Sequence, residues 1–282
     1  KQNELKERTM KNKRYMMEQH IVPYFGNQMM SEITAGQIIQ WQNEMQTKGF
    51  SEAYLRMIQN QLTSLYTHAS KIYDLHANPC KKVKRMGSSD NRSLDFWTVD
   101  EYQKFIQTME PGTRYYLIFE ILFWTGCRIG ELLALTPADF DFENNTMRIN
   151  KNYQKVKGRE IITSPKTKKS NRVVKIPQFL ADEIKDYMKC FYDLKPDQRL
   201  FFKSKGYLGY EITRGSKKAG IKRINIHALR HSHISLLMDR GFSALDIAER
   251  VGHEAISITY KYAHMYPNKQ DEMARKLEEE RS

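Results

Sequence analysis

Apolar residues recur at three- and four-residue steps through the first third of the chain, which is the spacing of amphipathic helices. The clearest series is Leu55, Ile58, Leu62, Leu65 and Tyr66. The pattern predicts helices over residues 6–20, 35–48 and 51–78. Pro23 and Pro79 end the first and the third, because proline disfavours helix in the residue before it. The first part of the chain is therefore predicted to be entirely helical.

The pattern changes in the middle of the chain. Residues 147–150, 159–162 and 172–176 alternate between apolar and polar, as strands do, and residues 157–158 and 167–171 are typical of turns. Helical spacing surrounds them, from Val99, over 114–126 and 129–135, and again from Gln178 onward. The second part is therefore predicted to be mostly α with a small antiparallel β-sheet (α+β).

A basic stretch without apolar periodicity, residues 81–90, lies between the two parts. We place a helical domain at 1–86, a linker at 87–92 and a second domain, with a helical tail, at 93–282. Two interpretations of the charge stay open: a solvated hinge, or a strap across a phosphate backbone. The residues that carry it are Lys81, Lys82, Lys84 and Arg85.

The charge of the chain favours a polyanionic partner, with nucleic acid first. The formal net charge is +13, and the excess is present in both parts: 14 basic and 8 acidic residues up to residue 92, and 32 and 25 after it. No apolar run is long enough to span a membrane. Three widely spaced cysteines, Cys80, Cys127 and Cys190, form no zinc or disulfide pattern and are expected to be free thiols in the cytoplasm.

Four segments carry residues suited to phosphoryl transfer. Two arginines can grip the non-bridging oxygens of a phosphodiester, where charge grows in the transition state. A tyrosine can attack phosphorus, a histidine can manage its proton, and a lysine on a hairpin can protonate the leaving oxygen. With these cations built in, no metal is required. The segments are residues 125–135 with Arg128, 165–167 with Lys166, 227–231 with Arg230, and 252–262, which ends at Tyr262.

These segments, in this order, closely resemble the tyrosine recombinase family, the integrases of phages and conjugative transposons. The matching patterns are Gly126-x-Arg128-x-x-Glu131-Leu132-x-x-Leu135, His227-x-x-Arg230, Gly252-His253 followed by Tyr262, and residues 21–26 near the start. Each is weak alone, but the four in order are a strong signal. The resemblance implies a two-domain DNA clamp, with the core-site binding domain at 1–86 and the catalytic domain at 93–282.

The resemblance also implies roles for single residues. Arg128 and Arg230 resemble the phosphate clamp, and His253 a further phosphate donor. Glu131 resembles the acidic residue behind the first arginine, in a supporting role. As alternatives, Arg128 could be a helix-surface arginine, and Glu131 could simply pair with a basic neighbour.

The remaining roles concern proton transfer and the nucleophile. By resemblance Tyr262 is the nucleophile, His227 manages the tyrosine proton and Lys166 is the general acid. The alternatives that stay open are Lys168 and Lys169 for Lys166, and Tyr260 and Tyr266 for Tyr262. We interpret His231 and His233 as packing or supporting residues.

The implied function is a site-specific recombinase that cuts and rejoins DNA through a 3′-phosphotyrosine, for integration or excision of a mobile element. The expected partners are double-stranded DNA with a specific core site, a homotetramer in the synaptic complex and accessory DNA-bending or excision factors, with no membrane. No cofactor is expected, neither metal nor ATP. The rival interpretations are a type IB topoisomerase and a catalytically inactive DNA-binding module. The start of the chain resembles the middle of a longer protein, and we expect it to lack the arm-binding domain of many relatives.

Overall fold

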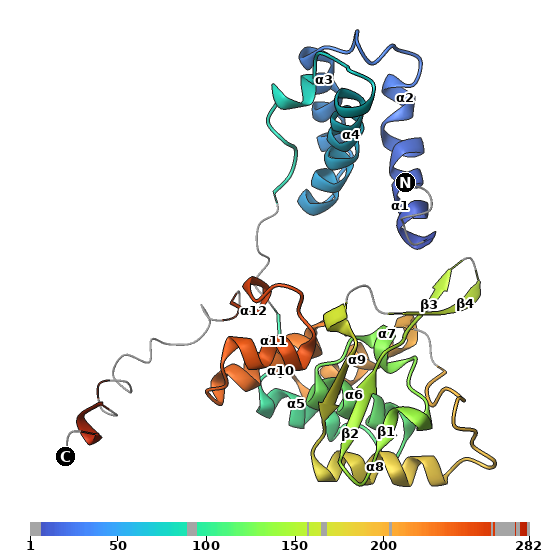
Figure 1. Cartoon of the computed structure of the whole chain (residues 1–282), viewed down its shortest axis with the longest axis vertical. Coiled ribbons are helices and arrows are strands. Elements are labelled where there is room, and N and C mark those ends of the chain that lie inside the picture. The colour runs from blue at the N-terminus through green and yellow to red at the C-terminus, as the bar shows by residue number, and fades with distance from the viewer. Residues whose placement is uncertain are drawn as a thin grey trace. The chain divides into compact units, whose positions relative to one another are not determined.

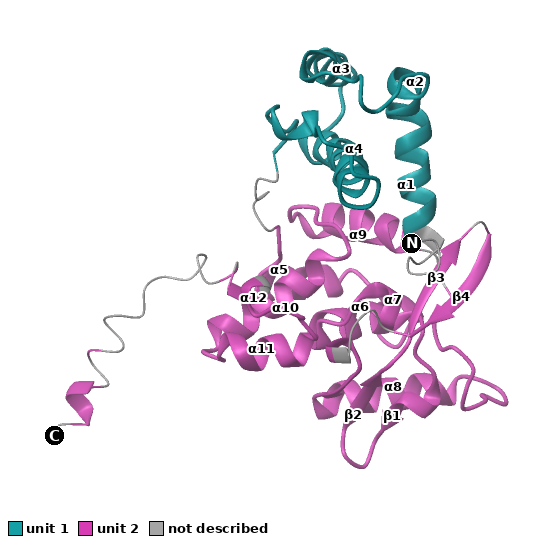
Figure 2. Cartoon of the chain, turned by 45° about the horizontal axis from the view of Figure 1, so that its top comes forward, with its two compact units in different colours: residues 1–92 teal, residues 93–282 magenta. Residues whose placement is uncertain are grey.

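The computed structural model describes residues 7–88, 95–156, 158–164, 168–202, 205–260, 262, 274 and 277–280. The chain divides into two compact units, residues 1–92 and 93–282 (Figures 1 and 2). Within the described residues, no helix combines the length and the apolar character that crossing a bilayer needs.

The first unit is helical, and its helices bury one continuous apolar core that includes Trp41 and Tyr66. Thr34 caps the helix Ala35–Thr47, and Ser51 caps the helix Glu52–Ile72. Each side chain accepts a hydrogen bond from a backbone N–H in the first turn of its helix. The elements are α1 (Glu7–His20), α2 (Val22–Phe25), α3 (Ala35–Thr47), α4 (Glu52–Ile72) and a 3-10 turn, η1 (Pro79–Lys81).

Two details of this unit differ from the sequence prediction. The helix α4 ends at Ile72 rather than at residue 78, and Asp74 then adopts a positive φ of 47°. The stretch after η1 is also packed rather than free, because Met86 is buried in the core and the carbonyl of Lys84 accepts a hydrogen bond from Gln42. The basic side chains of this stretch remain exposed, and the buried Met86 lies at the end of the domain placed at 1–86.

The second unit is mostly helical, with small antiparallel sheets, as the sequence predicts. The helix α6 is its centre: it is buried over most of its length and packs against α5, α7, α8 and α10. The helices are α5 (Val99–Ile106), α6 (Arg114–Thr125), α7 (Ile129–Leu132), α8 (Gln178–Lys189), α9 (Lys205–Ala219), α10 (Ala228–Asp239), α11 (Ala244–Val251) and α12 (Ser257–Tyr260).

The strands in the described part of the chain form two sheets rather than the single one predicted. β2 pairs with β1 and, in register Met147 to Val174, with β5, whereas β3 and β4 form a separate hairpin (Figure 1). The predicted turn before β5 contains a 3-10 turn, η3 (Lys168–Ser170). The strands are β1 (Phe140–Asp141), β2 (Thr146–Ile149), β3 (Asn152–Val156), β4 (Arg159–Thr163) and β5 (Arg172–Lys175), and η2 (Pro137–Asp139) precedes them.

Candidate active site

The first part of the site is the sharp turn between α6 and α7. Gly126 ends α6 with φ 63°, and a Cβ atom there would lie 2.6 Å from the His233 ring, so glycine is required for both conformation and space. The turn sets Arg128 immediately before α7, where its backbone N–H donates to Glu131 Oε2 (2.9 Å) and its Nη1 donates to Oε1 (2.8 Å). Glu131 therefore fixes both ends of this arginine.

A third arginine, Arg172 on β5, holds Glu131 from the other side. Its Nη2 lies 2.9 Å from Glu131 Oε2, and its Nε donates to the carbonyl of Arg250. Burial by itself would raise the pKa of the Glu131 carboxyl, but the guanidiniums of Arg172 and Arg128 hold it below its usual range. The buried carboxylate is thus ionised and aligns two cations.

Arg230, in the first turn of α10, is only 3% exposed. Its two terminal nitrogens donate to the carbonyls of Gly126 (2.8 Å) and Val251 (2.6 Å), which fixes the plane of the guanidinium. Burial, and then the charge of Arg128, lower the pKa of Arg230 to about 9. Arg128, Arg172 and Arg230 are three cations around the single carboxylate of Glu131, so the site has excess positive charge, which suits an anion.

Two histidines adjoin this cationic centre. His227 is the N-cap residue of α10, and His253 follows Gly252, whose φ of 69° ends α11. His253 Nδ1 makes a 2.9 Å hydrogen bond with Thr259 Oγ1. Burial and then neighbouring charge, from His231 for His227 and from Arg230 for His253, lower the pKa values to about 4 and about 3. Both rings are therefore neutral near pH 7 in the protein without DNA.

Tyr262 lies just after α12 and is 3% exposed, packed in a small apolar cluster with Ile234, Ile247 and Val251. Its hydroxyl makes a short hydrogen bond with Nδ1 of His231 on α10. Burial raises the pKa of Tyr262 to about 12, and Arg230 acts in the opposite direction. Its competitor Tyr260, at the end of α12, is 54% exposed.

The structure brings together six of the residues singled out in the sequence: Arg128, Glu131, His227, Arg230, His253 and Tyr262. Lys166 and Tyr266 lie outside the described residues, and so does the side chain of Lys168. Lys169 donates to the carbonyl of Glu254 (3.2 Å). The basic residues of 81–85 belong to the first unit and are exposed there.

Sequence reasoning missed Arg172 and Arg250, which support the site from behind. Arg250 Nε donates to His233 Nε2 (3.1 Å), and its terminal nitrogens donate to carbonyls of Trp124 and Lys175. An arginine at the start of a predicted strand gave no sign that it would meet Glu131, 41 positions earlier. The contact of His231 with Tyr262 was also missed: its place one turn after His227 on a helix was the available signal.

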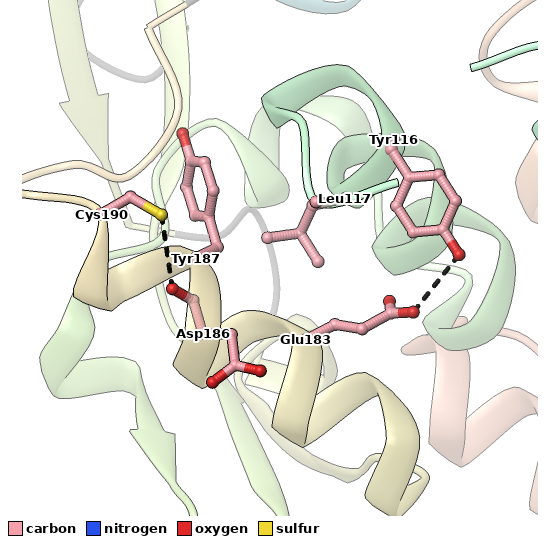
Figure 3. A pocket seen from close by; sticks show the side chains of 7 residues that line it. Tyr116, Leu117, Glu183, Asp186, Tyr187 and Cys190 are labelled. Carbon is pink, nitrogen blue, oxygen red and sulfur yellow. Dashed lines mark hydrogen bonds between the residues drawn. The ribbon is translucent and has the colours of Figure 1, made fainter. Parts of the chain in front are cut away.

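A pocket of about 180 Å³ lies between α6 and α8, lined by Tyr116, Leu117 and Glu183 among others (Figure 3). Tyr116 donates to Glu183 across it (3.3 Å). None of the residues that line this pocket belongs to the cationic cluster, so the two features are separate.

Family models match both parts of the chain. The Phage integrase family matches residues 95–269, and the family described as Phage integrase, N-terminal SAM-like domain, matches residues 1–46. The ICEBs1 integrase of Bacillus subtilis is 30% identical, over 95% of this chain and 77% of the relative. A XerC-like tyrosine recombinase of Caldanaerobacter subterraneus is 28% identical, over 84% and 69%.

Solved structures show the same fold. The Tn1549 transposon integrase in complex with transposon right end DNA superposes with a TM-score of 0.80 at 20% identity, covering 98% of this chain and 94% of that one. A lambda integrase dimer bound to a COC′ core site gives 0.66 at 18% identity, covering 92% and 72%. The chain therefore belongs to the phage integrase family. It is a site-specific recombinase of the tyrosine type.

Proposed function

We propose that the chain cuts one strand of double-stranded DNA at a specific core site by attack of the Tyr262 hydroxyl on phosphorus, and then rejoins that strand to a new partner. Family membership supports the class of reaction. The observation that carries the residue assignment is the cationic cluster of Arg128, Arg230, His227 and His253, together with Tyr262, which lies near Arg230 and contacts His231.

The positive charge of the cluster suits the scissile phosphodiester. Arg128 keeps 35% of its side chain exposed while Glu131 holds one edge, so part of its fork can meet a phosphate oxygen. Hydrogen bonds hold the side chains of Arg230 and His253 in fixed positions in the same cluster. Negative charge on the non-bridging oxygens grows as phosphorus becomes pentacoordinate, and prearranged donors stabilise that state more than the ground state.

The products of this step are a 3′-phosphotyrosine at Tyr262 and a free 5′-hydroxyl. The departing 5′ oxygen needs a proton, for which we propose Lys166 on the β4–β5 connection. The phosphotyrosine bond conserves the energy of the broken phosphodiester, so reversal with another strand completes the exchange. No metal or nucleotide cofactor enters the proposed reaction.

The assembly follows from the need to exchange strands between two duplexes. We propose that residues 1–86 bind the core site, with Lys81, Lys82, Lys84 and Arg85 on the phosphate backbone. Four protomers are needed for the four strands of two sites, so the active form is a homotetramer on DNA. Accessory DNA-bending or excision factors would set the direction, integration or excision of a mobile element.

The test uses nicked duplexes that carry the attachment site, which we would seek beside the encoding gene, together with supercoiled plasmid, all in EDTA. A denaturation-resistant protein–DNA adduct and recombinant products are expected. Relaxed plasmid without recombinants would indicate a topoisomerase, and binding without adduct an inactive module. Cleavage that requires added magnesium would contradict the proposal.

A further inference from the structure

His231 is the residue that contacts the hydroxyl of Tyr262 in the structure. Its Nδ1 atom makes the hydrogen bond, and the centroids of the two rings are 5.6 Å apart. His227, four residues earlier on the same face of α10, meets the His231 ring edge-on at 5.1 Å. The proton-accepting atom nearest the reacting oxygen in the described residues is thus on His231, although the sequence pattern singled out His227.

The buried hydroxyl of Tyr262 needs such an acceptor. Burial opposes its ionisation, and the positive charge of Arg230 favours it only partly. The charged and titratable groups that face His231 are Arg230 and His227 on α10, His253 after α11, and Tyr262 itself. Burial and the charge of Arg230 lower the pKa of His231, which keeps the ring neutral and able to accept a proton near pH 7.

We propose that His231, and not His227, takes the proton of Tyr262 when that residue attacks DNA; the inference rests on the proposed function. The O–H bond breaks and its proton passes to Nδ1, while the oxygen's electron pair forms the bond to phosphorus. The P–O5′ bond breaks, and its electron pair stays on the 5′ oxygen, which takes a proton from the general acid proposed above, Lys166. In the joining step a 5′-hydroxyl attacks phosphorus and gives its proton back to Lys166, the Tyr262 O–P bond breaks, and the departing tyrosine oxygen recovers its proton from His231. His231 therefore holds the proton between the two steps.

The geometry imposes one requirement on the tautomer. For Nδ1 to accept a proton, the neutral ring must carry its hydrogen on Nε2. An asparagine at this position could place an amide where Nδ1 now lies and keep a hydrogen bond to the tyrosine, but it could not take up a proton. His231→Asn thus separates positioning of the nucleophile from proton transfer.

The experiment measures single-turnover formation of the covalent adduct by wild type, His231→Asn, His231→Gln and His227→Asn on a nicked core site. The two His231 variants should bind DNA normally and form adduct about 10²- to 10⁴-fold more slowly, the range that general base catalysis supplies. The wild-type rate should fall as pH drops below the ordinary range of histidine, and this acid limb should be absent in His231→Asn, whereas His227→Asn should retain it.

A substrate with sulfur in place of the bridging 5′ oxygen is the second arm, because a thiolate leaves without protonation. Sulfur should restore Lys166→Ala but not His231→Asn. Near-normal adduct formation by His231→Asn, loss of the acid limb in His227→Asn instead, or rescue of His231→Asn by sulfur would each overturn the inference. Failure of wild type to form any adduct would instead contradict the proposed function.

Discussion

Arg128 and Arg230 differ in how much of each guanidinium the protein already uses. Both terminal nitrogens of Arg230 are committed to backbone carbonyls, and its side chain is buried. In Arg128, Nη1 donates a hydrogen bond to Glu131, and Nη2 makes only a longer one, of 3.3 Å, to the carbonyl of Gly252. The side chain of Arg128 remains partly exposed. Arg128 is thus the more accessible cation, and Arg230 is the more rigid one.

Replacing Arg128 by lysine should leave DNA binding intact and lower the rate of cleavage about 10²- to 10³-fold. Lysine keeps the charge but not the planar fork that can meet Glu131 and a phosphate oxygen together. Adduct formation under single-turnover conditions measures the effect, and Arg148→Lys, on the exposed side of β2, is the matched control. Cleavage by Arg128→Lys at the wild-type rate would remove Arg128 from the active site.

The helix α10 is the element that joins most of the site. His227 and Arg230 lie in or beside its first turn, His231 meets Tyr262, and His233 points to the other side, toward α6 and Arg250. Its apolar residues pack into the core between α6 and α11, which holds the chemical groups in fixed relative positions. A single helix thus links the phosphate clamp, the nucleophile and the support behind them.

The buried ring of His233 should make folding sensitive to acid. Burial, and then the charge of Arg250, lower the pKa of His233 to about 3 in the folded protein. In the unfolded chain the pKa has its ordinary value of 6.5. Between these values the unfolded chain binds the extra proton, so the free energy of unfolding falls as pH drops below 6.5. For this group the loss by about pH 5 amounts to roughly 2 kcal/mol.

The measurement is denaturant unfolding of wild type and His233→Asn at neutral and mildly acid pH. The variant should be less stable at neutral pH, because the hydrogen bond from Arg250 is lost, but it should lose roughly 2 kcal/mol less on acidification. The exposed His76→Asn should behave as wild type does. Parallel pH dependence in His233→Asn and wild type would show that His233 is protonated in the folded state.

The sequence predicted where helices and strands lie along the chain better than it predicted which of them pack together. Strong helical periodicity located most helices, and in the structure the side chains of Ser51 and Thr98 cap two of them. The strand β3 was missed because its buried residues, Tyr153 and Val156, are three apart and break the alternation. The end of α4 was misplaced because no glycine or proline stands between Ile72 and residue 79. The pairing of Arg172 with Glu131 depends on tertiary packing, which local pattern does not encode.

Across the whole molecule the basic excess is shared by both units, which favours a DNA contact that involves both. DNA binding should weaken steeply with salt, because each phosphate neutralised releases condensed counterions, with a slope near 0.9 per contact. Titrations between about 50 and about 200 mM salt measure this slope. An affinity that barely changes over this range would contradict binding through both basic units.

The four basic residues of 81–85 allow the two interpretations of that segment to be separated. Replacing Lys81, Lys82, Lys84 and Arg85 by alanine should lower the salt slope by about one for each phosphate contact that is lost. Their side chains are exposed, so the first unit should fold normally. An unchanged slope would favour the solvated hinge over a contact with the DNA backbone.

The central claim is that Tyr262 forms the covalent bond to DNA, and a pair of variants tests it most directly. Tyr262→Phe removes the hydroxyl of a buried ring that contacts His231. Tyr260→Phe removes the hydroxyl of an exposed ring on α12. On a nicked core-site duplex, Tyr262→Phe should bind DNA and form no adduct, whereas Tyr260→Phe should form it, with the modified peptide containing Tyr262. An adduct that persists in Tyr262→Phe and disappears in Tyr260→Phe would contradict the account.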